Sequence, residues 1–208
     1  MTAPPSPAPR RLLRAPPDDL CLDFVNTKFW RGTDAPTEQL HAPPDLLAWC
    51  AASGLWTLSL LEGLQAGWAA DPPRASAAFA AAIALREALW RIFAATTTAA
   101  APDAADLAAL NAALAAAPGP AALSWQDGDF VWAMPEGQTD PLLPVAWSAG
   151  ALLAGARRAR VRQCANPQCR WLFLDASKGG NRRWCAMSAC GNRAKAHRHY
   201  AKRRQARG

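Results

Sequence analysis

Apolar residues recur at helical spacing along most of the chain, in stretches that prolines and glycines interrupt. The longest stretch, from about Arg74 to Ala95, places its large apolar side chains on one wide face, which predicts an amphipathic helix. Further helices are predicted at residues 45–54, 58–70, 103–116 and 141–160, the last leading directly into the first C-terminal cysteine. The apolar segment 20–27 is too short for its period to distinguish a buried strand from a first helix.

A different pattern at 124–132 places apolar residues on both sides of Asp127-Gly128, which predicts a β-hairpin. Proline is frequent near the start of the chain and predicts a flexible tail. The sequence therefore predicts a mainly α fold with a tail at 1–19, a mostly helical domain with a small β-hairpin at 20–159, and a small module at 160–208.

Charge is divided sharply between the two ends of the chain. Residues 1–155 carry 8 basic and 15 acidic side chains, whereas residues 156–208 carry 15 basic and 1 acidic. An acidic body with a basic end indicates that a polyanion would bind only the C-terminal part. Nineteen of the 23 basic residues are arginine, which a biased nucleotide composition would also produce, but such a bias does not explain the clustering.

No stretch of the chain reaches the ~18 uninterrupted apolar residues of a transmembrane helix. The segment from Met1 to Pro17 contains six prolines and no apolar run long enough for a signal peptide. We therefore expect a soluble cytoplasmic protein with no membrane partner.

Four C-terminal cysteines form two pairs, Cys164 with Cys169 and Cys185 with Cys190, each with four residues between its members. Thiolates in two short loops, joined by a connection of ~15–20 residues, predict a tetrahedral four-thiolate zinc site. Disulfides are the alternative, but structural disulfides are rare in a reducing cytosol. The remaining two cysteines stand alone in apolar surroundings, which predicts inert core residues at Cys21 and Cys50.

The spacing between these cysteines predicts a loop, a hairpin and a helix, which together make a treble-clef-like four-cysteine zinc module. Its predicted elements are a turn at Asn166-Pro167, a strand at 171–174, a partner strand at 182–185 and a helix from Asn192 to the end. Some fifty residues form a marginal core by themselves, so the metal is expected to hold the module together with Trp171, Phe173 and Trp184. Because four cysteines already complete the site, His197 and His199 are expected not to be ligands.

Residues 184–195, which include Cys190-Gly191-Asn192-Arg193, resemble the CGNR zinc finger family, and residues 173–177 are also similar to that family. Residues 20–27 are similar to the opening of its usual companion, the ABATE domain. The resemblance implies a stress-associated bacterial transcription regulator that binds DNA in the cytoplasm and holds Zn²⁺. It also implies the metal ligands Cys164, Cys169, Cys185 and Cys190. It supplies no catalytic residue, and we expect no enzyme.

The leading functional hypothesis is a DNA-binding transcriptional regulator whose N-terminal domain senses a small-molecule effector or forms a homodimer. The basic residues expected to contact nucleic acid are Arg182, Arg183, Arg193, Lys195, Arg198, Lys202, Arg203, Arg204 and Arg207. An RNA-binding or protein-bridging adaptor is the alternative, because charge does not separate DNA from RNA. An enzyme is a third hypothesis, but a closed four-thiolate site lacks the open position that zinc catalysis needs.

Arg86 falls on the apolar stripe of its predicted helix, which is unusual for a charged residue. One interpretation is a stem that covers apolar surface while the guanidinium reaches water. The other is a buried guanidinium that pairs with Asp23 or with an anionic ligand. On the second interpretation, Asp23, Asn26 and Arg86 would form a ligand pocket in the N-terminal domain.

Overall fold

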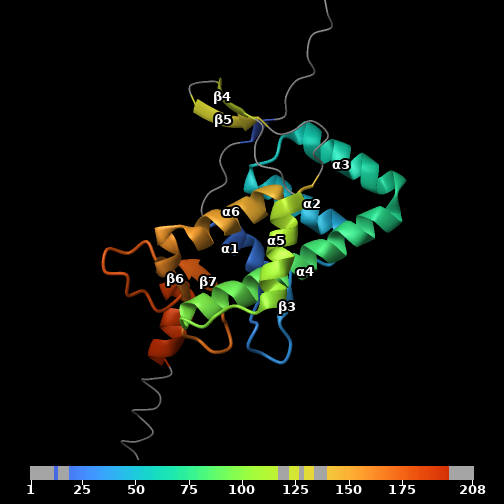
Figure 1. Ribbon diagram of the computed structural model, residues 1–208. Coiled ribbons are helices and arrows are strands. Elements are labelled where there is room, and N and C mark those ends of the chain that lie inside the picture. The colour runs from blue at the N-terminus through green and yellow to red at the C-terminus, as the bar shows by residue number, and fades with distance from the viewer. Residues whose placement is uncertain (1–11, 14–18, 117–121, 127–128, 134–139, 197–208) are drawn as a thin grey trace, which may run out of the picture.

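The computed structural model describes residues 12–13, 19–116, 122–126, 129–133 and 140–196 (Figure 1). The predicted mainly α fold is confirmed. Its helices are α1 Leu20–Val25, α2 Pro43–Ser53, α3 Leu58–Ala70, α4 Pro72–Thr97, α5 Ala104–Ala116 and α6 Leu143–Ala154. The segment whose period was ambiguous is thus the short helix α1.

Helix α1 lies at the centre of the molecule because almost every position in it is apolar. Its side chains are buried except that of Asp23, and the side chains of Phe24 and Val25 are fully buried. A helix that is apolar nearly all round must be covered on all sides. α4 and α6 both pack against it, and α4 supplies Ile92 and Phe93 to the same core (Figure 1). Cys21 and Cys50 are fully buried in this core, as predicted.

The prolines after α3 end one helix and begin the next. The side chain of Asp71 accepts a hydrogen bond from the backbone N–H of Arg74, at 3.0 Å, and so caps α4. Pro72 and Pro73 occupy the first turn of α4, where a missing N–H leaves no hydrogen bond unmade. α4 therefore begins two residues earlier than the apolar period alone predicts.

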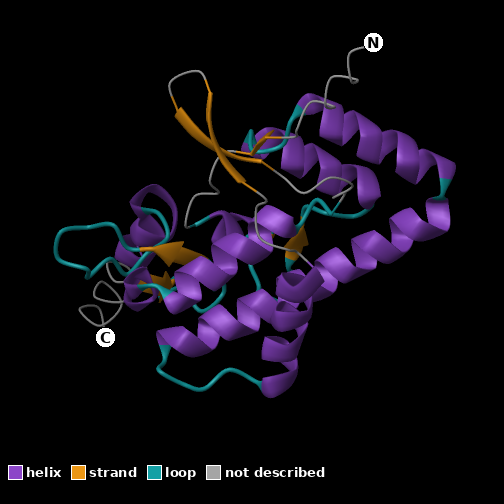
Figure 2. Cartoon of the chain, turned by 45° about the horizontal axis from the view of Figure 1, so that its top comes forward, coloured by secondary structure: helices purple, strands orange, loops and turns teal. Residues whose placement is uncertain are grey.

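The predicted hairpin is confirmed as β4 Ala122–Gln126 and β5 Asp129–Ala133, which pair antiparallel at the edge of the helical body (Figure 2). The turn residues 127–128 lie outside the described residues. β1 Leu12–Leu13 pairs with the other side of β5. Within the predicted flexible tail over 1–19, these two residues thus form a strand, and 1–11 and 14–18 are not described. A further ladder joins β2 Lys28–Phe29 to β3 Thr37–Glu38.

The last apolar helix is shorter than predicted. It ends at Ala154, where Gly155 takes an extended backbone, and the basic segment Ala156–Arg160 is a 3-10 turn. A strand, β6 Val161–Gln163, then precedes the first cysteine and pairs antiparallel with β7 Leu172–Leu174. The predicted partner of β7, residues 182–185, is not a strand. Val161 explains the difference, because β6 buries this side chain in the main core.

The C-terminal module and the N-terminal helices share that core. Leu172 of β7 is fully buried in it, and both strands contact α4. Directly after α1, the side chain of Asn26 donates to the carbonyl of Leu172 at 2.7 Å and accepts from its N–H at 3.1 Å. A side-chain amide thus replaces a strand partner for β7, so the module is joined to the body by hydrogen bonds as well as by apolar packing.

No helix in the described ranges has the length and apolar character that crossing a membrane would require.

Candidate metal centre and nucleic-acid surface

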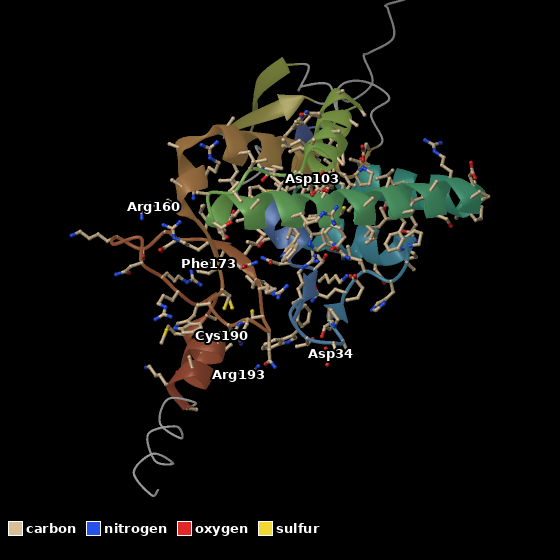
Figure 3. All side chains as sticks on the ribbon, turned by 60° about the horizontal axis from the view of Figure 1, so that its bottom comes forward. Asp34, Asp103, Arg160, Phe173, Cys190 and Arg193 are labelled. Atoms are coloured by element: carbon tan, nitrogen blue, oxygen red, sulfur yellow. The ribbon has the colours of Figure 1, made fainter. Side chains whose placement is uncertain are left out.

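The four C-terminal cysteines converge at one point, between Phe173 and Cys190 in Figure 3. All four sulfur atoms lie within 4.8 Å of one another. The Sγ of Cys185 is 3.7 Å from that of Cys169 and 3.8 Å from that of Cys190. Zn–S bonds of about 2.3 Å in a tetrahedron place the sulfurs about 3.8 Å apart. The spacing of the sulfur atoms therefore fits zinc.

Asn166 shapes the first cysteine loop. Its side-chain oxygen accepts from the backbone N–H of Gln168 at 3.1 Å, and its backbone oxygen accepts from Cys169 at 3.0 Å. Its side-chain amide donates to the sulfur of Cys190 at 3.5 Å. An N–H donor beside a sulfur stabilises the thiolate form that a metal needs. The Asn166-Pro167 turn predicted from the sequence thus also connects the two cysteine pairs.

One cysteine of the cluster, Cys185, is more acidic than those of the core. The hydrogen bond from Cys169 lowers the pKa of Cys185 to about 5 and raises the pKa of Cys169. Burial raises the pKa of Cys21 and of Cys50 to about 12, so both stay protonated. In the cluster, neighbouring thiolates repel one another, and a divalent cation among them would remove that repulsion.

Aromatic rings cover the cysteine cluster. The buried ring of Phe173 packs with the cysteines, together with the half-buried rings of Trp171 and Trp184, as predicted. The guanidinium of Arg182 lies 4.6 Å from the centre of the Phe173 ring and donates to the backbone carbonyls of Trp184 and Cys185. Arg182 therefore stabilises the second cysteine loop through these contacts.

Asp175, the one acid of the basic region, is buried and holds a turn. It accepts hydrogen bonds from the backbone N–H and the hydroxyl of Ser177, at 2.9 and 2.5 Å, and from the N–H of Arg182 at 2.9 Å. The hydroxyl of Ser177 is the main cause of the lowered pKa of this carboxyl. Because Asp175 is 1% exposed, its charge is directed into the module, and the exposed charge of this region is basic.

A loop of the N-terminal domain also packs against the cysteine cluster. The sequence analysis did not predict this contact. Trp30, with its backbone in the left-handed region at φ 56°, packs its ring against the buried cysteines. The N–H of Gly32 donates to the carbonyl of Gln168 at 3.0 Å. Trp30 and Gly32 precede Cys164 by more than a hundred residues, so the spacing of the cysteine motif could not indicate that they would lie beside it.

Gly32 leaves no room for a side chain. A Cβ at this position would lie 1.8 Å from the carbonyl oxygen of Pro167, so Gly32→Ala should force the two loops apart. We expect the substitution to lower the free energy of unfolding by about 1–3 kcal/mol. Chemical denaturation of the full chain measures this effect.

The control for that substitution is Gly67→Ala, on helix α3. Nothing lies within 4 Å of a Cβ built at Gly67, and alanine favours a helix over glycine by about 1 kcal/mol. Gly67→Ala should therefore leave the protein as stable as before or more stable. Equal stability of Gly32→Ala and the unaltered chain would show that the loop is not held against the first cysteine loop.

Arg86 is buried, so the interpretation in which its guanidinium reaches water is wrong. The residue is 1% exposed, and its two terminal nitrogens bind the carboxylate of Glu38 at 2.6 Å each. Its Nε lies 3.1 Å from Glu87, and one terminal nitrogen also donates to the hydroxyl of Thr27. Burial raises the pKa of the Glu38 carboxyl, but the hydrogen bonds from Arg86 and the backbone outweigh it and lower the pKa.

The three residues of the predicted ligand pocket take separate places. Arg86 pairs with Glu38 rather than with Asp23, which is exposed on the surface of α1. Asn26 binds the backbone of Leu172. A ligand pocket formed by Asp23, Asn26 and Arg86 remains a prediction, and these contacts show that Asn26 and Arg86 already have partners within the protein.

The predicted nucleic-acid contacts lie partly within the described residues. Arg183 is exposed, with its guanidinium 5.4 Å from the centre of the Trp184 ring. Residues 192–196 are helical, and Arg193 and Lys195 are exposed on this turn, directly after the cysteine cluster (Figure 3). The other predicted contacts lie outside the described residues, as do His197 and His199; these contacts are Arg198, Lys202, Arg203, Arg204 and Arg207.

Comparison with known families assigns both parts of the chain. Residues 18–156 match ABATE, described as "Putative stress-induced transcription regulator", and residues 160–203 match the CGNR zinc finger. These are descriptions of a regulator and a zinc finger, and neither is of an enzyme family. No curated protein matches the chain. The zinc-finger match and the sulfur geometry agree on Zn²⁺ as the cofactor. The chain thus belongs to the ABATE family, joined here to a C-terminal CGNR zinc finger.

Proposed function

We propose that this protein is a DNA-binding transcriptional regulator, with Zn²⁺ held by Cys164, Cys169, Cys185 and Cys190. The observation that carries the proposal is the exposed basic surface around the cysteine cluster. The single acidic residue of this region is buried. Residues 156–208 carry 15 basic side chains against that single acid, Asp175. Closely spaced cations repel one another in water, and a phosphate backbone removes this repulsion.

Zinc supports this surface by fixing the turn from which the basic helix starts. Cys190 lies in the turn Met187–Gly191, and the helical residues 192–196 follow without a break. Arg193 and Lys195 are therefore held at a fixed distance from the proposed zinc site. A phosphate contact, as proposed for Lys195, positions a protein on DNA, whereas contacts to base edges determine sequence preference.

The N-terminal domain is proposed to sense a ligand or to form a dimer. A cavity of about 530 Å³ lies between α3, α4 and α5, with Trp68, Leu64 and several alanines in its wall. Its lining is mainly apolar, with Arg74 and Asp140 as its charged members, and so suits a mainly apolar effector with a polar group. If no small molecule raises the melting temperature and the chain sediments as a monomer, this part of the proposal is wrong.

The cytoplasm is the proposed compartment. All six cysteines of the chain are free thiols in the structure, including the four of the cluster. Cysteines at these distances stay available to a metal only where disulfides do not form readily.

The test is DNA binding by the full chain over a salt series. With roughly five to seven phosphate contacts, log affinity for duplex DNA should fall with log salt at a slope of about −4 to −6. Lys195→Ala should flatten the slope by about one unit and weaken binding to all sequences alike. Arg91→Ala, an exposed arginine of α4 that pairs with Asp106, should change neither quantity in the folded protein.

The absence of any complex with duplex DNA at low salt would contradict the proposal. Tighter binding to structured RNA than to duplex DNA, measured in the same buffer, would instead favour the RNA-binding alternative. Equal slopes for the unaltered chain and Lys195→Ala would show that the helix after Cys190 is not a phosphate contact.

A further inference from the structure

A groove lies beside the cysteine cluster, on the side of the basic helix. It has a volume of about 340 Å³ and lies between the first cysteine loop, residues 165–168, and the start of the helix at Cys190 and Arg193. Trp184 contributes to its wall. The groove is thus built from both cysteine loops, which the metal holds together.

Arg193 at this groove is held by stacking. Its guanidinium lies 4.5 Å from the centre of the Trp30 ring. A guanidinium that stacks on an aromatic ring uses its flat face, which leaves the N–H groups in its plane available to a ligand. Two parallel N–H donors from an arginine are the commonest specific contact to guanine, at O6 and N7.

Arg182 offers a contrast within the same surface. It also stacks on a ring, but its N–H groups donate to the carbonyls of Trp184 and Cys185. Its donors are therefore engaged in holding the second cysteine loop. The two arginines have the same chemistry, and their contacts give them different roles.

The ring beneath Arg193 belongs to the N-terminal domain, and the two residues that follow Trp30 are both anchored. The N–H of Gly32 binds the carbonyl of Gln168, and the side chain of Arg31 forms an ion pair with Glu87 of α4 at 2.6 Å. Arg31 also lies 5.1 Å from the centre of the Trp90 ring. A ring held in this way reduces the conformational freedom that Arg193 would lose on binding.

We propose that this groove reads base edges of duplex DNA, with Arg193 contacting guanine and Trp30 acting as its positioning residue. The inference rests on the proposed DNA-binding function. It implies that sequence preference depends on the ABATE domain, although the zinc finger makes the contacts. Gln168, exposed at the other rim of the groove, is of the residue type that pairs with adenine.

The experiment begins with the zinc-loaded full chain and a pool of duplexes that carry a randomised 20-base-pair core. The most enriched duplex and a scrambled version of it then serve as probes, and the ratio of their dissociation constants measures sequence preference. Arg193→Ala should lower this ratio about tenfold, because one bidentate contact to a base is lost. Trp30→Leu should lower it about 2- to 5-fold, the share of a cation–π contact.

Trp30→Phe is the conservative variant, because it keeps an aromatic face, and it should restore most of the ratio that Trp30→Leu loses. Zinc content, measured in every variant, separates positioning from folding. A purely structural role for Trp30 would lower zinc content and binding to both probes together. A lowered ratio with unchanged zinc, rescued by phenylalanine, supports the inference.

Other results would overturn the inference in ways that differ from failure of the proposed function. No enrichment and no binding at low salt would reject DNA binding altogether. Binding without enrichment of any sequence would leave DNA binding intact and reject base reading. An unchanged ratio in Arg193→Ala would assign base reading to another residue, and an unchanged ratio in Trp30→Leu would reject the role of the N-terminal ring.

Discussion

Replacing Cys190 with serine should remove zinc from the protein, which should otherwise contain about one equivalent when purified without added metal. Cys190 is 2% exposed, and its sulfur lies 3.8 Å from that of Cys185. Structural zinc contributes on the order of 10 kcal/mol to the folding of small zinc modules. The loss should therefore unfold both cysteine loops. Elemental analysis and hydrogen exchange measure the two effects.

The unfolding should stop at the hairpin that joins the module to the body. β6 and β7 bury Val161 and Leu172 in the main core, and Asn26 binds the backbone of Leu172. We therefore expect exchange protection to be lost at residues 164–170 and 184–192 but kept at 161–163 and 172–174. Cys50→Ser, a buried cysteine outside the cluster, should keep its zinc. Full zinc content in Cys190→Ser, or a disulfide in the unaltered protein, would contradict the assignment of ligands.

Replacing Arg86 with methionine should lower the free energy of unfolding by about 1–3 kcal/mol, because it leaves the half-buried carboxylate of Glu38 without its buried partner. Both terminal nitrogens of Arg86 bind that carboxylate at 2.6 Å, and the guanidinium is 1% exposed. Glu87 is less affected, since it keeps an ion pair with Arg31 at 2.6 Å. Urea unfolding, with zinc content as a check on the C-terminal site, measures the loss.

The matched control removes both partners. Arg86→Met combined with Glu38→Gln should recover part of the lost stability, because the half-buried carboxylate is no longer left unpaired. The pKa of Glu38 is lowered in the folded protein, so its contribution is present above the ordinary carboxyl pKa of about 4.3 and is lost as the pH falls below it. The difference in the free energy of unfolding between the unaltered chain and Arg86→Met should therefore become smaller in acid. A constant gap across this range would show that the ion pair is not its cause.

The helices could be predicted from the sequence because their signals are local. The prediction of 58–70 agrees with α3 at both ends, where Thr57 caps its start and Pro72 follows its end. The Asp127-Gly128 signal and the alternation beside it likewise predicted β4 and β5. The four cysteines of the zinc cluster were found for the same reason, since each ligand pair lies within one short loop.

Pairings between distant segments could not be predicted in this way. β7 has a nearer strand candidate at 182–185, yet it pairs with β6, because only β6 buries an apolar side chain in the main core. Arg86 was recognised as unusual, but Glu38, its partner, lies 48 positions away on another element. Tertiary packing brings such a partner into contact, and no pattern along the sequence indicates which residue it will be.

The sequence by itself determined the helices, the hairpin, the zinc ligand pattern and the basic character of the C-terminal end, because each depends on residues close together in the chain. The tertiary structure alone decided how these parts act on one another. It brought Trp30 beneath Arg193, Gly32 against the first cysteine loop and Asn26 onto β7. Each of these contacts joins residues more than a hundred positions apart, and only the shared apolar core brings them within hydrogen-bonding or stacking distance.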